Sequence, residues 1–451
     1  MITSPAFAGK RFAVLGLARS GLASVEALLA SGARVTAWDN REEARLSVEA
    51  LNDPAKVQTN LELIDPLTFD LNGYDGVVVS PGVPLNRHPI ADHAARAGVP
   101  VIGDIELFAI ARATLPAHKV VAITGTNGKS TTTALVHHIC MCAGRNALMG
   151  GNIGLPIMGQ APLQPNVAGP GVYVLELSSY QIDLTYSLAP DISALINLSP
   201  DHLDRYNGYE GYAASKARLP GMQHGGQHAV FGAGDADTLR IARETTARTD
   251  GPRVHVVDLT ALTGQADWPS LQGPHNLQNA AIAVAMVEQL GITEAQWRPA
   301  LASFVGLPHR MERVATHNGV LFVNDSKATN PASTAPALAA FPRVHWIVGG
   351  LPKGDDLDEC LPHLGHVVAA YTIGEAGPRF AQLLERSVPV TRSEMLCEAV
   401  RQAMDAAAPG DVVMLSPACA SFDQFRDFEA RGDAFRDMVK ALIAERQETR
   451  S

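Results

Sequence analysis

The sequence predicts an α/β protein with three domains, in which parallel strands alternate with helices. Short apolar and β-branched runs recur along the chain, with helical stretches between them. The 451 residues are enough for about three domains of the usual size. Hydrophobic residues make up 46% of the chain and charged residues 18%, as in compact α/β enzymes. We expect the domains to span residues 1–107, 108–306 and 307–451.

The first domain opens with a strand, a glycine turn, an amphipathic helix and a second strand over residues 10–40. This order is typical of a Rossmann-like unit, which Asp39 closes. The glycine fingerprint is incomplete, because Gly16 and Gly21 are present but Ala18 occupies the middle position. The turn therefore either approaches a phosphate or only packs a helix on a strand, and it is weak support for NAD.

The central domain carries the most informative motif, VVAITGTNGKSTTTA at residues 120–134. A β-branched strand runs through a glycine turn into a helix, as in P-loop ATPases. Gly125 and Gly128 let backbone N–H groups face phosphate oxygens, and Lys129 brings a positive charge to the β and γ phosphates. The motif predicts ATP binding, and the alternative is a glycine turn before an ordinary helix.

The same motif matches the generic Walker pattern only in its second half. That pattern has a glycine five positions before Gly128, where this chain has Ile123. After the lysine, Ser130 or Thr131 offers a hydroxyl group to Mg²⁺.

Several other strands end in polar or turn residues. Residues 76–84 run into Ser80 and a Pro-Gly pair, and residues 172–181 and 192–206 are apolar runs that end in polar clusters. Because the carboxyl ends of parallel strands meet at one edge of a sheet, these ends should face ligand crevices. The third domain, expected to be a second Rossmann-like unit, has its strand candidates at 320–326, 344–350, 367–374 and 412–418.

Charge and cysteine content restrict the class of protein further. A net charge of −10 argues against a nucleic-acid partner. The five cysteines are scattered, odd in number and without metal-ligand spacing, which favours a reducing compartment. No apolar run is long enough to span a membrane and the first residues do not form a signal peptide, so we expect a cytoplasmic protein.

Eight motif segments lie in order along nearly the whole chain. They are GTNGKST (125–131), GNIG (151–154), LELSSYQ (175–181), NLSPDHLDRY (197–206), HNLQNAAIA (275–283), GLPHRMERV (306–314), NDSKATNP (324–331) and LSPACASFDQFRDFEARGDAF (415–435). Together they resemble the Mur ligases, and the last two blocks resemble the members that add D-glutamate. The incomplete glycine pattern fits, because the loop of that family begins at TGTNGK.

The resemblance implies an ATP-dependent ligase that activates a carboxylate as an acyl phosphate, which an amine then attacks. It implies ATP and two Mg²⁺ ions as cofactors, with UDP-N-acetylmuramoyl-L-alanine and D-glutamate as substrates in peptidoglycan precursor synthesis. We expect a monomer without nucleic-acid partners or membrane insertion.

The resemblance also implies the roles of individual residues. The catalytic residues it implies are Lys129, His202, Lys216, Arg310 and Lys327. The metal ligands it implies are Ser130, Glu176, His202 and Lys216, with Lys216 carbamylated. Without the resemblance, His202 is better explained as a hydrogen-bonded structural histidine and Lys216 as a solvated lysine on a helix.

Two further sets of residues are implied as binding contacts. For ATP they are Gly125, Thr126, Asn127, Gly128, Lys129, Ser130, Thr131, Asn276, Asn279, Arg310 and Asp325. For the substrates they are Leu17, Asp39, Arg41 and Ser80 at the UDP end, Asn152 and Ser178 near the muramoyl group, and Thr329, Lys353, Ser421 and Phe428 for D-glutamate. The alternatives are a helix cap for an asparagine and a surface ion pair for Asp325 and Lys327.

Three other functions compete with this interpretation. The nearest is another amide ligase of the same superfamily that adds a different amino acid or acts on folate. A second alternative, a nicotinamide dehydrogenase, is supported only by residues 11–39. A nucleotide-binding regulatory protein without catalysis is disfavoured, because Lys129, Glu176, His202, Lys216 and Lys327 are all present together.

Overall fold

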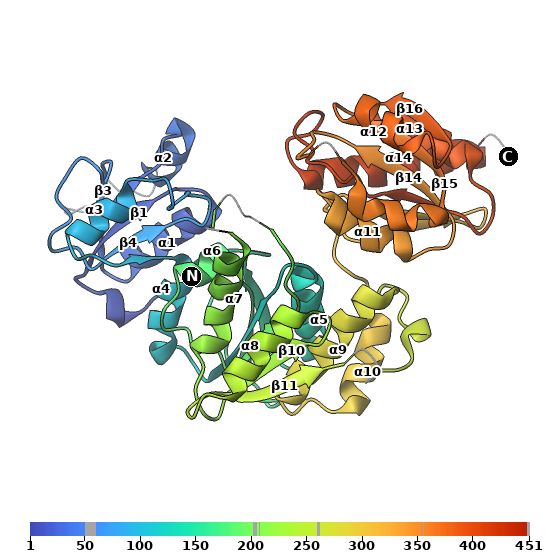
Figure 1. Cartoon of the computed structure of the whole chain (residues 1–451). Helices are drawn as coiled ribbons and strands as arrows, with labels where there is room; N and C mark the ends of the chain where they lie inside the picture. The colour runs from blue at the N-terminus through green and yellow to red at the C-terminus, as the bar shows by residue number, and fades with distance from the viewer. Residues whose placement is uncertain (50–59, 202–204, 207, 259–261, 355, 449–451) are drawn as a thin grey trace. The chain divides into compact units, whose positions relative to one another are not determined.

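The computed structural model describes the chain except for a few short segments. The described residues are 1–49, 60–201, 205–206, 208–258, 262–354 and 356–448. The chain divides into two compact units, the first made of Met1–Ala261 with Gln278–Ala300 and the second of Leu262–Leu277 with Leu301–Ser451. The first unit contains two sheets and the second contains one (Figure 1).

The first sheet is parallel throughout and has the strand order β3-β2-β1-β4-β5. Because β2 and β3 lie on one side of β1 and β4 and β5 on the other, the strand order reverses at β1, and ligands bind at such a switch point in open α/β sheets. The strands are β1 Arg11–Leu15, β2 Arg34–Trp38, β3 Leu61–Leu63, β4 Gly76–Val79 and β5 Val101–Ile102. The helices are α1 Arg19–Ala30, α2 Glu42–Glu49, α3 Ile90–Arg96 and α4 Asp104–Ala111.

The central sheet is also parallel, with the order β11-β10-β9-β6-β8-β7. Its strands are β6 His118–Thr124, β7 Ala147–Gly151, β8 Gly171–Glu176, β9 Ile192–Leu195, β10 His228–Gly232 and β11 Arg253–Val257. The helices that follow in this part of the chain are α5 Lys129–Cys142, α6 Ser179–Asp183, α7 Tyr209–Gly221, α8 Ala236–Thr246, α9 Pro274–Glu288 and α10 Glu294–Ser303.

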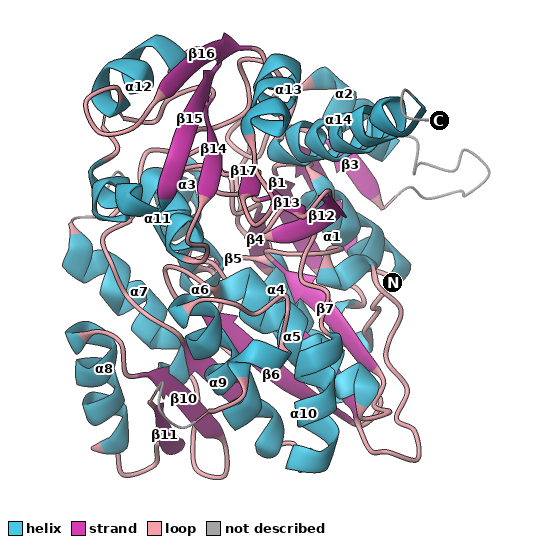
Figure 2. Cartoon of the chain, turned by 90° about the vertical axis from the view of Figure 1, so that its right-hand side faces the viewer, coloured by secondary structure: helices cyan, strands magenta, loops and turns pink. Residues whose placement is uncertain are grey.

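The third sheet has the order β12-β13-β17-β14-β15-β16 and is parallel except for its edge strand β12. Its strands are β12 Glu312–His317, β13 Val320–Asn324, β14 Val344–Gly349, β15 Val367–Ile373, β16 Val390–Glu394 and β17 Val412–Leu415. Its helices are α11 Pro331–Ala339, α12 Gly377–Leu384, α13 Leu396–Ala406 and α14 Phe428–Glu448. Figure 2 shows the strands of this sheet with helices of the same unit beside them.

Apolar residues on both faces of the third sheet explain why it is covered on both sides. One core cluster joins Trp346 and Val348 of β14 to residues of α11 and α12. The other joins Ile347 of β14 to residues of α13 and α14. Alternate residues of one strand thus enter opposite cores, as expected for a parallel sheet buried between helices.

The predicted fold class is confirmed: the protein is α/β with three parallel or nearly parallel sheets. The strand candidates in the third domain correspond to β13, β14, β15 and β17. The runs 172–181 and 192–206 contain shorter strands than predicted, because β8 ends at Glu176 and β9 at Leu195. The edge strands β12 and β16 were not predicted. Each of the five cysteines is a free thiol.

Candidate active site

The glycine turn after β6 has the backbone of a phosphate-binding loop. Gly128 has φ +82° and Gly125 has φ +150°, values that residues with side chains rarely adopt. A Cβ atom on Gly128 would lie 2.2 Å from Oδ1 of Asn279, so the expected nucleotide asparagine touches the loop directly. Helix α5 begins at Lys129, so its N-terminal N–H groups face the turn, where anions are favoured.

Lys129 is folded back over this loop. Its Nζ atom donates to the carbonyl oxygens of Gly125, at 2.9 Å, and Thr126, at 2.7 Å. The loop is braced by Asn197, which accepts from the Thr126 N–H through its carbonyl oxygen and from the Asn127 N–H through Oδ1. The positive charge is therefore held at the mouth of the anion-binding turn. The hydroxyl-bearing Ser130 and Thr131 are both buried in the first turn of α5.

Glu176 and Lys216 are both buried near the end of the central strands. Glu176 ends β8 and accepts from Nδ2 of Asn152 at 2.8 Å. Lys216 lies on α7, and its Nζ donates to Oγ1 of Thr124 at 3.3 Å and lies 4.7 Å from the Tyr212 ring centroid. Burial, and then the positive charge of Lys129, lower the pKa of Lys216 well below its ordinary range. The predicted ligand His202 lies outside the described residues.

Asn152 and Ser178 have different local roles. The Asn152 N–H donates to the carbonyl oxygen of Glu176 at 2.8 Å, which fixes the 151–154 turn beside that carboxylate. Ser178 caps α6, because its Oγ accepts from the Gln181 N–H in a capping box. The predicted contact between Ser178 and the muramoyl group stays a prediction.

The expected UDP contacts gather at the switch point of the first sheet. Asp39 follows β2 and accepts from the N–H groups of Leu17, at 2.8 Å, and Arg41, at 2.9 Å. Burial alone would raise the pKa of Asp39, but these hydrogen bonds and the Arg41 side chain outweigh it and lower the pKa. Ser80 follows β4, and its Oγ donates to the Gly16 carbonyl at 2.7 Å. The structure brings these four expected residues to the carboxyl ends of neighbouring strands.

In the second unit, Arg310 lies in a loop with unusual backbone geometry. Its neighbours His309 and Met311 have φ values of +61° and +48°, which is uncommon for residues other than glycine. The Met311 N–H donates to Oδ1 of Asp325 at 3.1 Å, and Ser416 Oγ donates to Oδ2 at 2.8 Å. Burial raises the pKa of Asp325 to about 6, although the hydrogen bond from Ser416 and the charge of Arg310 act against it.

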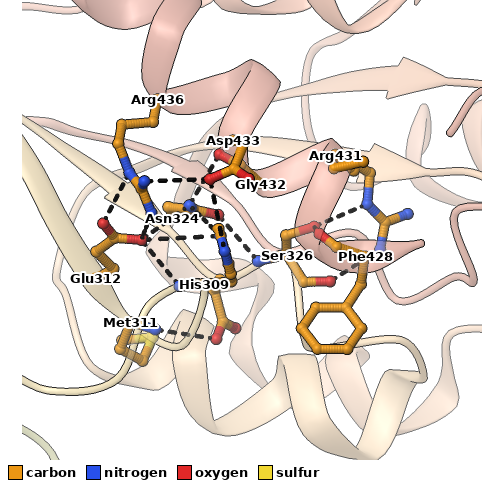
Figure 3. Close-up of polar contacts among 12 residues, drawn as sticks. His309, Met311, Glu312, Asn324, Ser326, Phe428, Arg431, Gly432, Asp433 and Arg436 are labelled. Carbon is orange, nitrogen blue, oxygen red and sulfur yellow. Dashed lines mark hydrogen bonds and ion pairs between the residues drawn. The ribbon is translucent and has the colours of Figure 1, made fainter. Parts of the chain in front are cut away.

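A polar cluster that sequence reasoning missed fixes this loop (Figure 3). Nδ2 of Asn324 lies 3.0 Å from Nδ1 of His309 and donates to Oε2 of Glu312 and the carbonyl oxygen of Gly432, each at 3.0 Å. Arg436 of α14 donates to both carboxylate oxygens of Glu312. Asn324 and Gly432 are 108 positions apart in sequence, so no local pattern indicated the cluster.

Arg431 was also missed, although it lies in a quoted motif. It is 1% exposed and donates to the carbonyl oxygens of Ser326, Cys419 and Ala420 and to Oγ of Ser326. Burial lowers its pKa to about 10. Figure 3 shows Ser326 beside both Arg431 and Phe428. The guanidinium group therefore holds together the segments that carry three of the four expected D-glutamate contacts, Thr329, Ser421 and Phe428.

Those expected contacts lie close together in the second unit. Lys353 Nζ donates to Oγ1 of Thr329 at 3.3 Å. Lys327 Nζ lies 5.4 Å from the Phe428 ring centroid, within cation–π range. Ser421 is buried on the segment that Arg431 holds. The expected nucleotide residue Asn276, in the first turn of α9, donates to the carbonyl oxygen of Gln272, which precedes that helix.

The described residues contain neither a membrane-spanning helix nor a cluster of metal-binding side chains. No helix among those residues is long and apolar enough to cross a membrane. In the same part of the chain, no three His, Cys, Asp or Glu side chains form a group that could hold a metal ion. The expected metal ligands are Ser130, Glu176, Lys216 as a carbamate and His202, which lies outside the described residues.

Comparison with known families covers all three sheets. The family described as "Mur ligase MurD-like, N-terminal domain" matches residues 10–103, "Mur ligase middle domain" matches 123–260, and "Mur ligase, glutamate ligase domain" matches 309–419. The chain therefore belongs to the Mur ligase family, and it is an ATP-dependent enzyme that forms amide bonds.

Relatives of high identity narrow the assignment within the family. A Novosphingobium aromaticivorans protein named UDP-N-acetylmuramoylalanine--D-glutamate ligase is 74% identical over 99% of this chain and 98% of its own. One of the same name from Sphingopyxis alaskensis is 58% identical over 98% of this chain and 100% of its own. The chain is thus similar along its whole length to proteins of one name, and its N-terminal domain is of the MurD-like kind.

Solved structures support the fold alone, because sequence identity to them is low. The UDP-N-acetylmuramate-alanine ligase of Thermotoga maritima has a TM-score of 0.57 at 16% identity and covers 96% of this chain and 99% of its own. The UDP-N-acetylmuramoylalanyl-D-glutamyl-2,6-diaminopimelate--D-alanyl-D-alanyl ligase of Acinetobacter baumannii has a TM-score of 0.58 at 16% identity and covers 97% of this chain and 92% of its own.

Proposed function

We propose that this ligase adds D-glutamate to UDP-N-acetylmuramoyl-L-alanine through an acyl phosphate, in cytoplasmic peptidoglycan precursor synthesis. The observation that carries the proposal is the pair of lysines, Lys129 and Lys216, at one phosphate-binding turn beside the buried Glu176. The names of the relatives support the choice of D-glutamate. In the first step the substrate carboxylate attacks the γ-phosphorus of ATP and ADP leaves; in the second the amine displaces phosphate.

Lys129 stabilises the charge that develops on the transferring phosphoryl group, because two hydrogen bonds to carbonyl oxygens of the loop fix its position. Mg²⁺, when bound, supplies further neutralisation of the phosphate oxygens. Two ions are expected, held by Ser130, Glu176, His202 and the carbamate of Lys216. The buried carboxylate of Glu176 and the hydroxyl of Ser130 fit the oxygen donors that Mg²⁺ prefers.

Carbamylation of Lys216 is supported by the chemistry of its surroundings. The reaction joins a neutral amine to CO₂ and releases one proton, so it requires an amine that is not protonated. Burial and the nearby Lys129 favour the neutral form of Lys216. The product is an anion, which the positive charge of Lys129 attracts.

The remaining roles are proposed for the groups that each unit brings together. In the second unit Thr329, Lys353, Ser421 and Phe428 bind D-glutamate, whose two carboxylates suit cations and hydroxyl groups, and Lys327 is catalytic and acts on the reacting carboxylates. Arg310 and Asp325 there act on the nucleotide, as does Asn276. In the first unit Asn279 contacts the nucleotide, Leu17, Asp39, Arg41 and Ser80 bind the UDP end, and Asn152 and Ser178 orient the muramoyl group.

We also propose domain limits of 1–107, 108–306 and 307–451 and a monomeric state. The three sheets support this division, because each lies within one of these ranges.

The direct test is phosphate release from ATP with Mg²⁺ and UDP-N-acetylmuramoyl-L-alanine. Release should require D-glutamate and should not be supported by L-glutamate, L-alanine or meso-diaminopimelate. A folded Lys129→Ala variant should release none. Turnover with another amino acid at the D-glutamate rate would exclude the substrate assignment, and a near wild-type rate in the variant would exclude the role of Lys129.

A second test addresses the carbamate. Lys216→Ala should be inactive and should regain part of its activity with a short carboxylic acid that replaces the missing anion. Full activity without the acid would contradict the proposal.

A further inference from the structure

Arg205 connects the central sheet to the first sheet within the first unit. Its Nη2 atom donates to the carbonyl oxygens of Val83, at 3.1 Å, and Pro81, at 3.4 Å. The guanidinium carbon lies 4.1 Å from the ring centroid of Tyr180 on α6. The side chain therefore rests on the central domain while its donors reach backbone of the first domain.

The backbone that Arg205 contacts is part of the expected UDP crevice. The Val83 N–H donates to the Ser80 carbonyl at 3.0 Å, which closes a tight turn after β4. Oγ of Ser80 donates to the carbonyl oxygen of Gly16, and a Cβ on Gly16 would lie 3.0 Å from Cβ of Ser80. A movement of this turn must therefore change the glycine turn at the switch point of the first sheet.

On its other side, Arg205 is connected to the phosphate loop through three tyrosines, Tyr180, Tyr206 and Tyr212. The ring of its neighbour Tyr206 stacks on Tyr180, with centroids 6.1 Å apart, and meets Tyr212 edge to face at 5.7 Å. The Tyr212 hydroxyl lies 3.2 Å from Oγ1 of Thr126, which belongs to the phosphate loop. The contacts thus run without a break from one expected nucleotide site to the other.

Tyr206 is itself fixed by polar contacts, so the connection is rigid. Its hydroxyl donates to Oδ2 of Asp183 at 2.8 Å, and the hydroxyl oxygen lies 3.3 Å from Oγ of Ser215. Ser215 precedes Lys216 on α7 and donates to the carbonyl oxygen of Ser179. A shift of Tyr206 would therefore displace Ser215, which is next to the expected carbamate at Lys216.

We propose that Arg205 is a positioning residue that couples the UDP-binding crevice to the ATP phosphate loop, so that each ligand strengthens binding of the other. The proposal rests on the proposed function, because it assumes that a uridine nucleotide binds at Ser80. An arginine suits the task because its planar group can stack on a ring and donate two hydrogen bonds in the same plane. A lysine could keep one hydrogen bond but not the stacking.

The test measures binding of a non-hydrolysable ATP analogue with Mg²⁺ by calorimetry, with and without saturating UDP-N-acetylmuramoyl-L-alanine. Linkage requires the ATP analogue to increase the affinity for the UDP substrate by the same factor, and titration in the reverse order checks this. For the wild type we expect the second ligand to bind at least about fivefold tighter, at the lower end of usual coupling. In Arg205→Ala the factor should fall close to one, while each ligand alone binds with nearly its wild-type affinity.

Arg248→Ala is the matched control, because Arg248 also donates to two backbone carbonyls, those of Pro220 and Gln223, but both belong to the central domain. It should keep the wild-type coupling. If Arg205→Ala does not fold, the same titrations are made with Arg205→Lys, in which the coupling factor should be smaller than in the wild type.

Three results would overturn the proposal: no coupling in the wild type, full coupling in the Arg205 variant, or equal loss of coupling in the control. A wild type that binds the ATP analogue but no UDP substrate would instead refute the proposed function itself, and the inference with it.

Discussion

Asp104 is a buried carboxylate at the start of α4, and replacing it with asparagine should change how the stability of the first unit depends on pH. The side chain is 4% exposed, and burial raises its pKa from the ordinary value of 3.8 to about 6. Asparagine has nearly the same shape but cannot ionise. The Asp104→Asn variant therefore removes the cost of the buried charge with little change in packing.

The size of the effect follows from the two pKa values. A carboxyl group that binds its proton more tightly in the folded state stabilises that state below pH 3.8, and this contribution is lost as the pH rises through about 6. Each unit of difference between the folded and unfolded pKa corresponds to about 1.4 kcal/mol, so the free energy of unfolding of the wild type falls by about 3 kcal/mol over this pH range. The variant should gain this amount relative to the wild type between about pH 4 and pH 7.

Hydrogen exchange measured on peptides from α4 between pH 5 and pH 8, corrected for intrinsic exchange, gives the local free energy of opening. The difference between variant and wild type should rise to a plateau above pH 7. Asp92→Asn is the control, because Asp92 lies in the first turn of α3 but is exposed, and it should give no such trend. A difference that stays constant with pH, or that falls as the pH rises, would refute the reasoning.

Three further predictions concern close packing and acid stability. Gly128→Ala should weaken binding of an ATP analogue by about tenfold or more, because its φ of +82° costs about 1–2 kcal/mol with a side chain and the new Cβ overlaps Asn279. Gly432→Ala should lower the unfolding free energy by about 1–3 kcal/mol in urea titrations, because its Cβ would lie 2.2 Å from Nδ1 of His309. Burial alone would raise the pKa of Asp411, but its hydrogen bonds lower it to about 2. Its contribution, on the order of 1–2 kcal/mol after solvent screening, is present above pH 3.8 and lost toward pH 2, and acid titration of Asp411→Asn should lack that loss.

The packing prediction at the phosphate loop has a built-in control. Gly291 has φ +78° but nothing within 4 Å of a Cβ atom, so Gly291→Ala adds the same backbone strain without an overlap. It should leave binding of the ATP analogue unchanged. Equal binding by the Gly128 and Gly291 variants would contradict the steric argument.

Much of the fold could be predicted because its central strands are buried on both faces. Such strands are continuous apolar runs, as in VVAI of β6 or VHWIVG of β14, and are visible without any alternation. The edge strands β12 and β16 were not predicted, because they read ERVATH and VTRSE and bury few of their residues. Edge strands often carry polar residues, which limit pairing with other chains. Because of these residues, an edge strand has no apolar run by which it could be recognised in the sequence.

The candidate site divides in the same way between local and distant interactions. The glycine turn before α5 was predictable because five consecutive residues, 125–129, carry its geometry. The cluster around His309 and Asn324 was not, because it forms only when α14 brings Gly432 against them. Arg431 likewise holds together segments about a hundred residues apart, and nothing around it in sequence marks a buried arginine.

The two lysines of the phosphate site should depend on each other in a measurable way. Burial is the main cause of the lowered pKa of Lys216, and the charge of Lys129 is the next. Lys129→Ala removes that second cause and also the cation that would attract a carbamate, so both changes reduce carbamylation at a fixed CO₂ concentration. Carbon-13 NMR with labelled bicarbonate should then show a weaker carbamate signal than in the wild type. Lys119→Ala, at the opposite end of β6, should leave the signal unchanged. A signal as strong in Lys129→Ala as in the wild type would mean that burial alone controls the amine, and Lys129 would then act on the nucleotide only.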